Sequence, residues 1–404
     1  MKREARDFRE GMPRPVQRIP LEENASRSRL IWTLIALTVA AGAFFFGFRG
    51  ILNGEAGWTV IESEGIYGAS MTLRYRLGET KDSPSAEQKK VRQIYALALE
   101  ENGKAFDIRN ASEEPRNLAW LNRHPNTETE IAPILFQALQ ASLASGRWVY
   151  LGPLYEMNES LLASRTDAEA EQSDPRRNPE MAKFLEEILP MLQTDEHIRI
   201  EFTDGNRVCL HISEALRAMG ESYGVERWID FGWQRGAYLT DAVAAALSAA
   251  GAEHGVLTYQ HGFVRCLEKG ASFRMDIHGA EGSGQVRTES LTYTGPISIL
   301  SLSAFPSPDL PAGYRYGDGT LRTPWISAAD GLYHAPVDTM VAAARESGCA
   351  ELLTQVLPVL TRESWEDSLP SLKDTTAMLV WKNGIRTATR NADGMLEDAG
   401  SNVP

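Results

Sequence analysis

The chain has 404 residues, a formal net charge of −13 and 43% hydrophobic residues. This length suffices for one large domain or two ordinary ones. The acidic balance argues against nucleic acid and against an anionic membrane surface as partners. The three cysteines lie far apart and form no C-x-x-C pair, which argues against a zinc site or a thioredoxin-type motif.

The first 48 residues have the pattern of a signal anchor. Residues 1–29 contain eight Lys or Arg residues against five acidic ones, and residues 30–48 form an uncharged apolar run. About 20 apolar residues can cross a bilayer, and this run ends without the small-residue cleavage site of a secretory signal. The alternative is a buried core helix, which the absence of a polar face disfavours.

The positive-inside rule places residues 1–29 in the cytoplasm and the chain after residue 48 outside. We therefore expect a single-pass protein of the cell membrane, held there by residues 30–48. A tether, residues 49–64, should lead to one extracytoplasmic domain over residues 65–395, followed by a polar tail, residues 396–404.

The extracytoplasmic part mixes strand and helix patterns. Alternating apolar and polar residues predict strands, and apolar residues at helical spacing predict helices. The predicted strands are 70–76, 198–202, 207–211, 255–260, 263–267, 272–277, 296–302, 377–381 and 386–390. The predicted helices are 85–102, 131–144, 181–189, 214–220, 241–250 and 348–360, and Pro190 is expected to end the third of these. Residues 161–179 are polar and predict an exposed loop. Because no βαβ alternation is sustained, the predicted class is α+β.

Several segments stand in an order that is characteristic as a set. The earlier ones are Tyr67 to Met71 (Y-G-A-S-M), Phe106 to Ile108 followed by Ser112-Glu113, and Trp148 to Tyr155, which ends in a G-P-L-Y strand. The later ones are Asp230 to Asp241 (D-F-G-W-Q-R-G-A-Y-L-T-D), His261-Gly262, and Pro324 to Gly331. Together they resemble the FAD:protein FMN transferase family, also called ApbE. The resemblance implies an ApbE-like, T-fold-related α+β domain.

The resemblance also implies a chemistry. Members of that family are flavoprotein transferases that bind FAD and Mg²⁺ and move FMN onto a Thr of a partner, here a membrane redox protein. Carried over by motif, the FAD-binding residues are Ser112, Glu113, Asp230, Tyr238, Asp241, His261 and Gly262. The metal candidates are Thr354 and Glu351, since hard cations prefer oxygen ligands.

Some family positions are substituted. Gly236 stands where the family has Lys, with Arg235 one residue before it. Ala350 stands where the family has its metal-binding Asp, and Glu351 is rotated from it by about 100° around the helix. Two functions therefore follow from the sequence. One is an FMN transferase with an altered site, and the other is a non-catalytic flavin-binding or protein-interaction module of the cell envelope.

Each candidate also has a purely structural interpretation. These are a helix-end charge for Asp241, a helix start for Ser112 and Glu113, core packing for Tyr238, Trp233 and Thr354, a turn for His261, and a surface position for Arg235. Trp233 takes the place of a family Gly, so its indole is expected to crowd a backbone turn that otherwise approaches a ligand.

Overall fold

The computed structural model describes residues 56–61, 71–260, 262–281, 284–305, 313–362, 364–382, 385–388 and 395–398. The chain divides into two units, Met1–Gly54 and Glu55–Pro404, and every described residue belongs to the second. The predicted anchor, residues 30–48, and most of the predicted tether lie outside the described residues. Within the described ranges, no helix has both the length and the apolar character needed to span a membrane.

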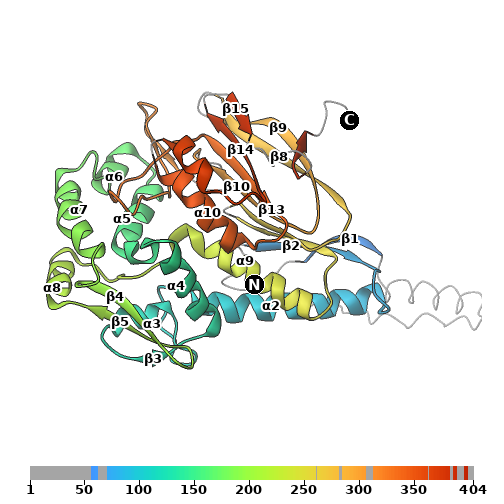
Figure 1. Ribbon diagram of the computed structural model, residues 1–404, viewed down its shortest axis with the longest axis horizontal. Coiled ribbons are helices and arrows are strands. Elements are labelled where there is room, and N and C mark those ends of the chain that lie inside the picture. Colours follow the sequence, from blue (N-terminus) through green and yellow to red (C-terminus); the bar gives the residue numbers. More distant parts are fainter. Residues whose placement is uncertain are drawn as a thin grey trace, which may run out of the picture. The chain divides into compact units, whose positions relative to one another are not determined.

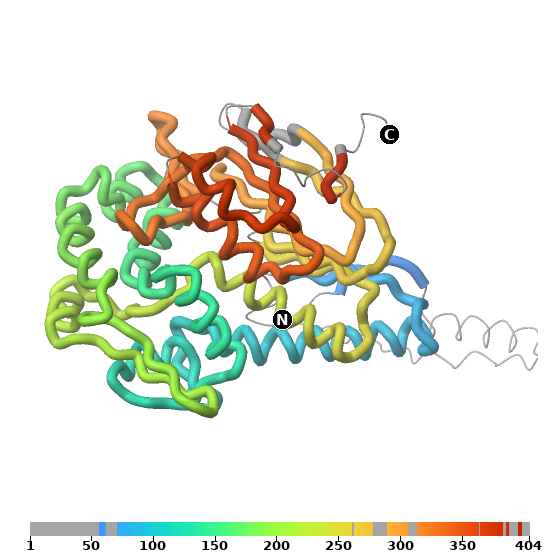
Figure 2. The backbone as a smooth tube through the Cα atoms, viewed as in Figure 1, coloured from blue at the N-terminus to red at the C-terminus, as the bar shows by residue number. Residues whose placement is uncertain are grey.

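An eight-stranded antiparallel sheet, which we call the main sheet, organises this unit (Figure 1). Its order is β1-β2-β6-β7-β10-β13-β14-β15. The strands are β1 Gly57–Ile61, β2 Met71–Leu77, β6 Gly255–Tyr259, β7 Phe263–Cys266, β10 Ile297–Ser303, β13 Thr339–Ala344, β14 Thr376–Lys382 and β15 Ile385–Ala388. Figure 2 shows that the early, blue part of the chain forms one edge and the late, red part the other.

Helices cover one face of the main sheet and a β-hairpin covers the other. Alternate strand residues, such as Leu300 and Met340, pack with the helices α2 Pro84–Ala105, α9 Arg235–Ala249 and α10 Cys349–Thr361. Their neighbours Ile299 and Val341 pack with β8 Ser272–Glu281 and β9 Gly284–Thr294. β16 Glu397–Asp398, in the predicted polar tail, pairs with β9. Because both faces are covered, β13 is buried at every position.

A mainly helical region follows α2 in the chain. Its helices are α3 Leu118–Arg123, α4 Pro133–Ser145, α5 Gly152–Leu162, α6 Asp167–Gln172, α7 Pro179–Leu192 and α8 Glu214–Tyr223. A small sheet accompanies them, with β3 Thr129–Glu130, β4 Ile198–Thr203 and β5 Arg207–Ile212. The remaining short elements are the 3-10 turns η2 Trp148–Leu151, η3 Gly232–Gln234 and η4 Trp365–Ser371, and the hairpin β11 Tyr314–Arg315 with β12 Leu321–Arg322.

The α+β class is confirmed, and four local predictions are wrong. Residues 161–179 are no exposed loop, because they include the end of α5, all of α6 and the fully buried Asp174. Pro190 does not end the helix, because it lies inside α7, which continues to Leu192. The expected strand at 148–155 is η2 and the start of α5, with Pro153 in the first helical turn. The helix expected from Asp241 already begins at Arg235.

Candidate functional site

A pocket of about 720 Å³ lies between the main sheet and the β8–β9 hairpin, and we call it the sheet pocket. Its volume is in the range of small-molecule sites. Three of the family-like segments meet there and contribute Trp233, Gly262 and Pro324. The other aromatic and basic lining residues are Trp58, Tyr259, Phe273, Tyr293, Trp325, Arg74, Arg76 and Arg274.

Gly262 occupies a position at the pocket wall that no other residue fits. Its φ is +86°, and a Cβ built on it would lie 1.8 Å from the carbonyl oxygen of Ser301. The Gly262 N–H donates to the Tyr259 carbonyl at 3.0 Å, and its own carbonyl accepts from the Ser301 N–H at 2.8 Å. The tight turn between β6 and β7 therefore requires glycine. His261, the other residue of this motif, lies outside the described residues.

Trp233 forms a wall of the sheet pocket. Its ring lies nearly parallel to that of Phe263, with centroids 6.1 Å apart. Gly236 packs so closely on the next strand that a Cβ would lie 2.3 Å from the Tyr259 ring. The Lys of the family motif therefore has no room at residue 236. Arg235, expected at the surface, is half-buried and interacts with Tyr259 and Asp230.

Asp230 is a buried carboxylate that lines neither the sheet pocket nor the second pocket described below. It accepts a hydrogen bond from the Gly232 N–H at 2.9 Å. Its other oxygen has no hydrogen-bond partner among the described residues and lies 3.7 Å from Nη1 of Arg227. Burial raises the pKa of Asp230 from 3.8 to about 6, although the Gly232 N–H and Arg227 lower it. This carboxylate shapes the turn that leads into η3.

A second pocket, of about 810 Å³, lies between α4, α9 and α10, and we call it the helix pocket. It brings together four predicted site residues from two distant parts of the sequence. They are Tyr238 and Asp241 on α9, and Glu351 and Thr354 on α10. Ala350, at the family's metal position, also lines it. Tyr238 is at the same time a core aromatic, packed edge-to-face against Phe231 at 5.1 Å.

Asp241, which lies on α9, caps the N-terminus of α10. One carboxylate oxygen accepts from the Cys349 N–H and the other from the Ala350 N–H, each at 2.8 Å. A negative charge at these first amides of α10 is favourable because of the helix dipole. Burial raises the pKa of Asp241, and the two amide hydrogen bonds oppose that rise. Both carboxylate oxygens are thus already used within the protein.

The donors of the helix pocket do not fit a magnesium ion. The Glu351 carboxylate is paired with Lys373, which lowers its pKa. The Thr354 hydroxyl donates to the Glu351 carbonyl at 2.8 Å, and Ala350 offers no side-chain ligand. Magnesium requires several oxygen ligands in near-octahedral geometry. Among the described residues, no group of three or more His, Cys, Asp or Glu is arranged to hold a metal.

Ser112 and Glu113 line neither pocket. The Ser112 N–H donates to Oδ1 of Asn117 at 3.1 Å, and the Glu113 carboxylate lies 3.9 Å from Nε of Arg116. Asn117 caps α3 through the Trp120 N–H. The two predicted flavin contacts therefore lie in the loop before a helix, and neither is the residue that caps it.

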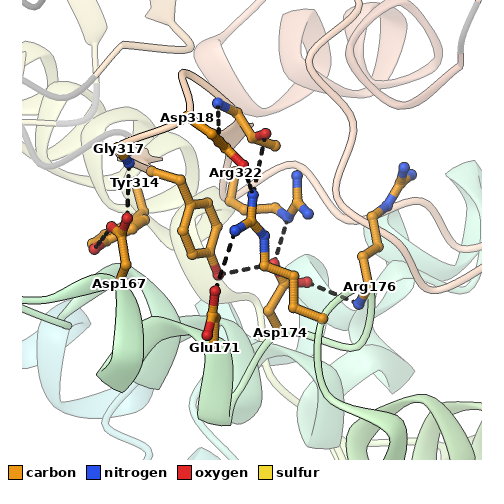
Figure 3. Close-up of polar contacts among 11 residues, drawn as sticks. Asp167, Glu171, Asp174, Arg176, Tyr314, Gly317, Asp318 and Arg322 are labelled. Atoms are coloured by element: carbon orange, nitrogen blue, oxygen red, sulfur yellow. Dashed lines mark hydrogen bonds and ion pairs between the residues drawn. The ribbon is translucent and has the colours of Figure 1, made fainter.

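A buried ion pair holds the segment that carries Pro324 (Figure 3). Nε of Arg322 donates to Oδ2 of Asp174 at 2.9 Å, and the two side chains are 8% and 0% exposed. The Tyr316 hydroxyl donates to the same oxygen at 2.9 Å. We call this group, Asp174, Tyr316 and Arg322, the latch. The latch connects the chain after α6 to the β11–β12 hairpin. Arg322 lies two residues before Pro324, so the latch also holds the wall of the sheet pocket that Pro324 forms.

The sequence does not single out several residues of the sheet pocket. Arg74 lies on the exposed side of a strand whose alternation is correctly predicted, but the pattern does not show what faces it. Trp58 lies in the predicted tether, and Phe273 and Tyr293 lie on strands more than 190 residues further along. Only the pairing of distant strands brings these side chains together.

No protein-family model and no curated protein matches the sequence. Solved structures do match. The ApbE protein of Thermotoga maritima is 14% identical with a TM-score of 0.57, over 82% of this chain and 97% of that one. The flavin transferase ApbE from Vibrio cholerae is 15% identical with a TM-score of 0.55, over 84% and 99%. The apo flavinyl transferase ApbE of Pseudomonas stutzeri is 13% identical with a TM-score of 0.54, over 85% and 98%. The chain therefore has the fold of the ApbE flavin transferases.

Proposed function

We propose that the protein binds a flavin nucleotide in the sheet pocket and does not transfer FMN. The observation that carries this proposal is the composition of the pocket wall. The flat isoalloxazine ring needs aromatic walls, which Trp233, Tyr259 and Trp325 supply. The anionic phosphates need a basic group in the wall, and the pocket is lined by arginines that can offer one. The shared ApbE fold supports the choice of a flavin among flat, anionic ligands.

The helix pocket supports the absence of magnesium-assisted transfer. In that chemistry the metal would neutralise charge on the pyrophosphate of FAD. Asp241 is committed to the amides of α10, and Glu351 is committed to Lys373. Freeing either carboxylate leaves a helix end or a lysine without its partner. The residues present therefore favour binding over transfer.

The second candidate function is FMN transfer from FAD to a Thr of a membrane redox protein. One observation favours it. Tyr238, Asp241 and Thr354, which the resemblance assigns to flavin and metal, still share one pocket. FMN transfer would also require at least one metal ligand in addition to these three residues. AMP release is its direct signature, because the adenylate half of FAD leaves when FMN is transferred.

We further propose that residues 30–48 anchor the protein in the cell membrane and that the flavin-binding unit is extracytoplasmic. The apolar run and the basic segment before it support this placement. Protease treatment of intact and of permeabilised cells tests it. Cleavage of the unit only after permeabilisation of the membrane contradicts the proposed orientation.

The function is tested on full-length protein in mild detergent with FAD, Mg²⁺ and a Thr-containing acceptor. We expect FAD binding without AMP release. Thr258→Trp, on the exposed pocket floor, should fill the sheet pocket and abolish binding. Thr72→Trp is the matched control, because Thr72 is the exposed cross-strand partner of Thr258 and does not line the pocket. Magnesium-dependent AMP release establishes the second function, and equal loss of binding in both variants contradicts the assignment of the pocket.

A further inference from the structure

We infer that Arg74 is the phosphate-binding residue of the sheet pocket, so that the ligand is a phosphorylated flavin and not riboflavin. This inference rests on the proposed binding of a flavin nucleotide and adds the residue that holds its phosphate. Three observations carry it: the ion pairs of the other pocket arginines, the position of Arg74 on the main sheet, and the aromatic rings next to its guanidinium.

The charges of the other two pocket arginines are compensated. Arg76 forms ion pairs with Glu268 and Glu79. Nε of Arg274 lies 3.4 Å from the Asp276 carboxylate, and its Nη2 donates to the Ser290 hydroxyl at 2.9 Å. Arg74, in contrast, forms no ion pair with any residue that the structure describes. In a chain of net charge −13, this uncompensated cation marks one point of the pocket for an anion.

Arg74 lies on the pocket side of the main sheet. It pairs in register with Val60 on one neighbouring strand and with Val256, a pocket residue, on the other. Its guanidinium carbon is 5.9 Å from the centroid of the Trp58 ring. An arginine stacked on an aromatic ring keeps the N–H groups at its edge available, and these groups match the oxygens of a phosphate.

The aromatic residues around Arg74 continue the pocket into the hairpin. Trp58 packs edge-to-face against Phe273 at 5.5 Å, and Phe273 stacks with Tyr293 at 5.5 Å. Arg74 is close enough to Tyr293 to oppose the rise in pKa that burial causes in that phenol. A flavin ring against Trp233 and a phosphate at Arg74 therefore occupy two different parts of one pocket.

This arrangement predicts a measurable preference. FMN differs from riboflavin by one phosphate, so a contact to Arg74 should raise the affinity for FMN by about tenfold, as one charge-assisted contact at a partly exposed site does. Because the contact is electrostatic and accessible to water, the preference should shrink as salt is raised from roughly 50 mM to roughly 500 mM.

The test is a fluorescence titration of riboflavin, FMN and FAD into the full-length protein. The wild type should prefer FMN and FAD over riboflavin at low salt, and Arg74→Gln should lose that preference while riboflavin binding stays unchanged. Arg274→Gln is the matched control, because its charge is already compensated, and it should keep the preference. Arg74→Lys should restore part of it.

The outcomes separate the role of Arg74 from flavin binding itself. Equal binding of FMN and riboflavin by the wild type overturns the role of Arg74 and leaves flavin binding intact. A preference for FMN that survives in Arg74→Gln has the same meaning. Absence of binding of any flavin refutes the proposed function itself. The comparison between ligands and salt concentrations needs only the wild type, so it does not depend on the folding of a variant.

Discussion

Replacement of Asp230 by Asn should make the protein more stable at neutral pH. The carboxylate is 2% exposed, and burial raises its pKa from 3.8 to about 6. That rise corresponds to about 3 kcal/mol against the ionised form in the folded state. Arg227, at 3.7 Å, compensates only part of the burial. Asn is uncharged and keeps an oxygen that can accept from the Gly232 N–H.

The sign follows from proton binding. Between pH 3.8 and about 6 the folded protein holds a proton on Asp230 that the unfolded chain releases. The contribution of Asp230 to stability is therefore complete below pH 3.8 and is lost as the pH rises through about 6. The Asn variant has no such loss. Its advantage over the wild type should grow by up to about 3 kcal/mol between roughly pH 4 and pH 7.5.

Urea unfolding followed by tryptophan fluorescence measures this difference at a series of pH values. Subtracting the two free energies of unfolding removes the contributions of all other titrating groups that the substitution leaves unchanged. A difference between variant and wild type that stays constant from about pH 4 to pH 7.5 would refute the reasoning, because no proton would then be linked to the burial of this carboxylate.

Three other substitutions test the described contacts. Gly262→Ala should lower the free energy of unfolding by about 3 kcal/mol or more and weaken FAD binding, since its methyl group would overlap the Ser301 carbonyl; normal stability contradicts this. Asp241→Asn should cost about 1–2 kcal/mol in urea unfolding, because one amide of α10 loses its acceptor, and an unchanged midpoint contradicts the cap. Asp174→Asn should cost about 3–5 kcal/mol in thermal unfolding, and the double variant with Arg322→Met should recover much of it; additive losses contradict the buried pair.

The sequence predicts local elements well where one strong pattern covers the segment. Alternation identifies β2, and apolar spacing identifies α2, α4 and α10 within a few residues. β13 is missed because both of its faces are buried, so that its residues do not alternate. The segment 161–179 is misassigned because its polar residues form hydrogen bonds and ion pairs with the β11–β12 hairpin, as in the latch, and composition alone does not reveal such partners.

For the candidate site, too, the sequence indicates which residues matter but not which partners they contact. Tyr238, Asp241 and Thr354, which the motifs select, line one pocket, although about 100 residues separate the two helices that carry them. The partners of these residues are not readable from the sequence. Asp241 is committed to the amides of α10 and Glu351 to Lys373, and both facts come from tertiary packing. Arg74 is likewise significant only once the β8–β9 hairpin lies opposite it.

Titration of FAD into the full-length protein in the presence of a chelator tests metal-independent flavin binding most directly. Quenching of flavin fluorescence should saturate at one FAD per chain, and the dissociation constant should stay the same when the chelator is replaced by Mg²⁺. Failure to saturate in the chelator, or saturation that appears only with Mg²⁺, would contradict flavin binding by the sheet pocket alone.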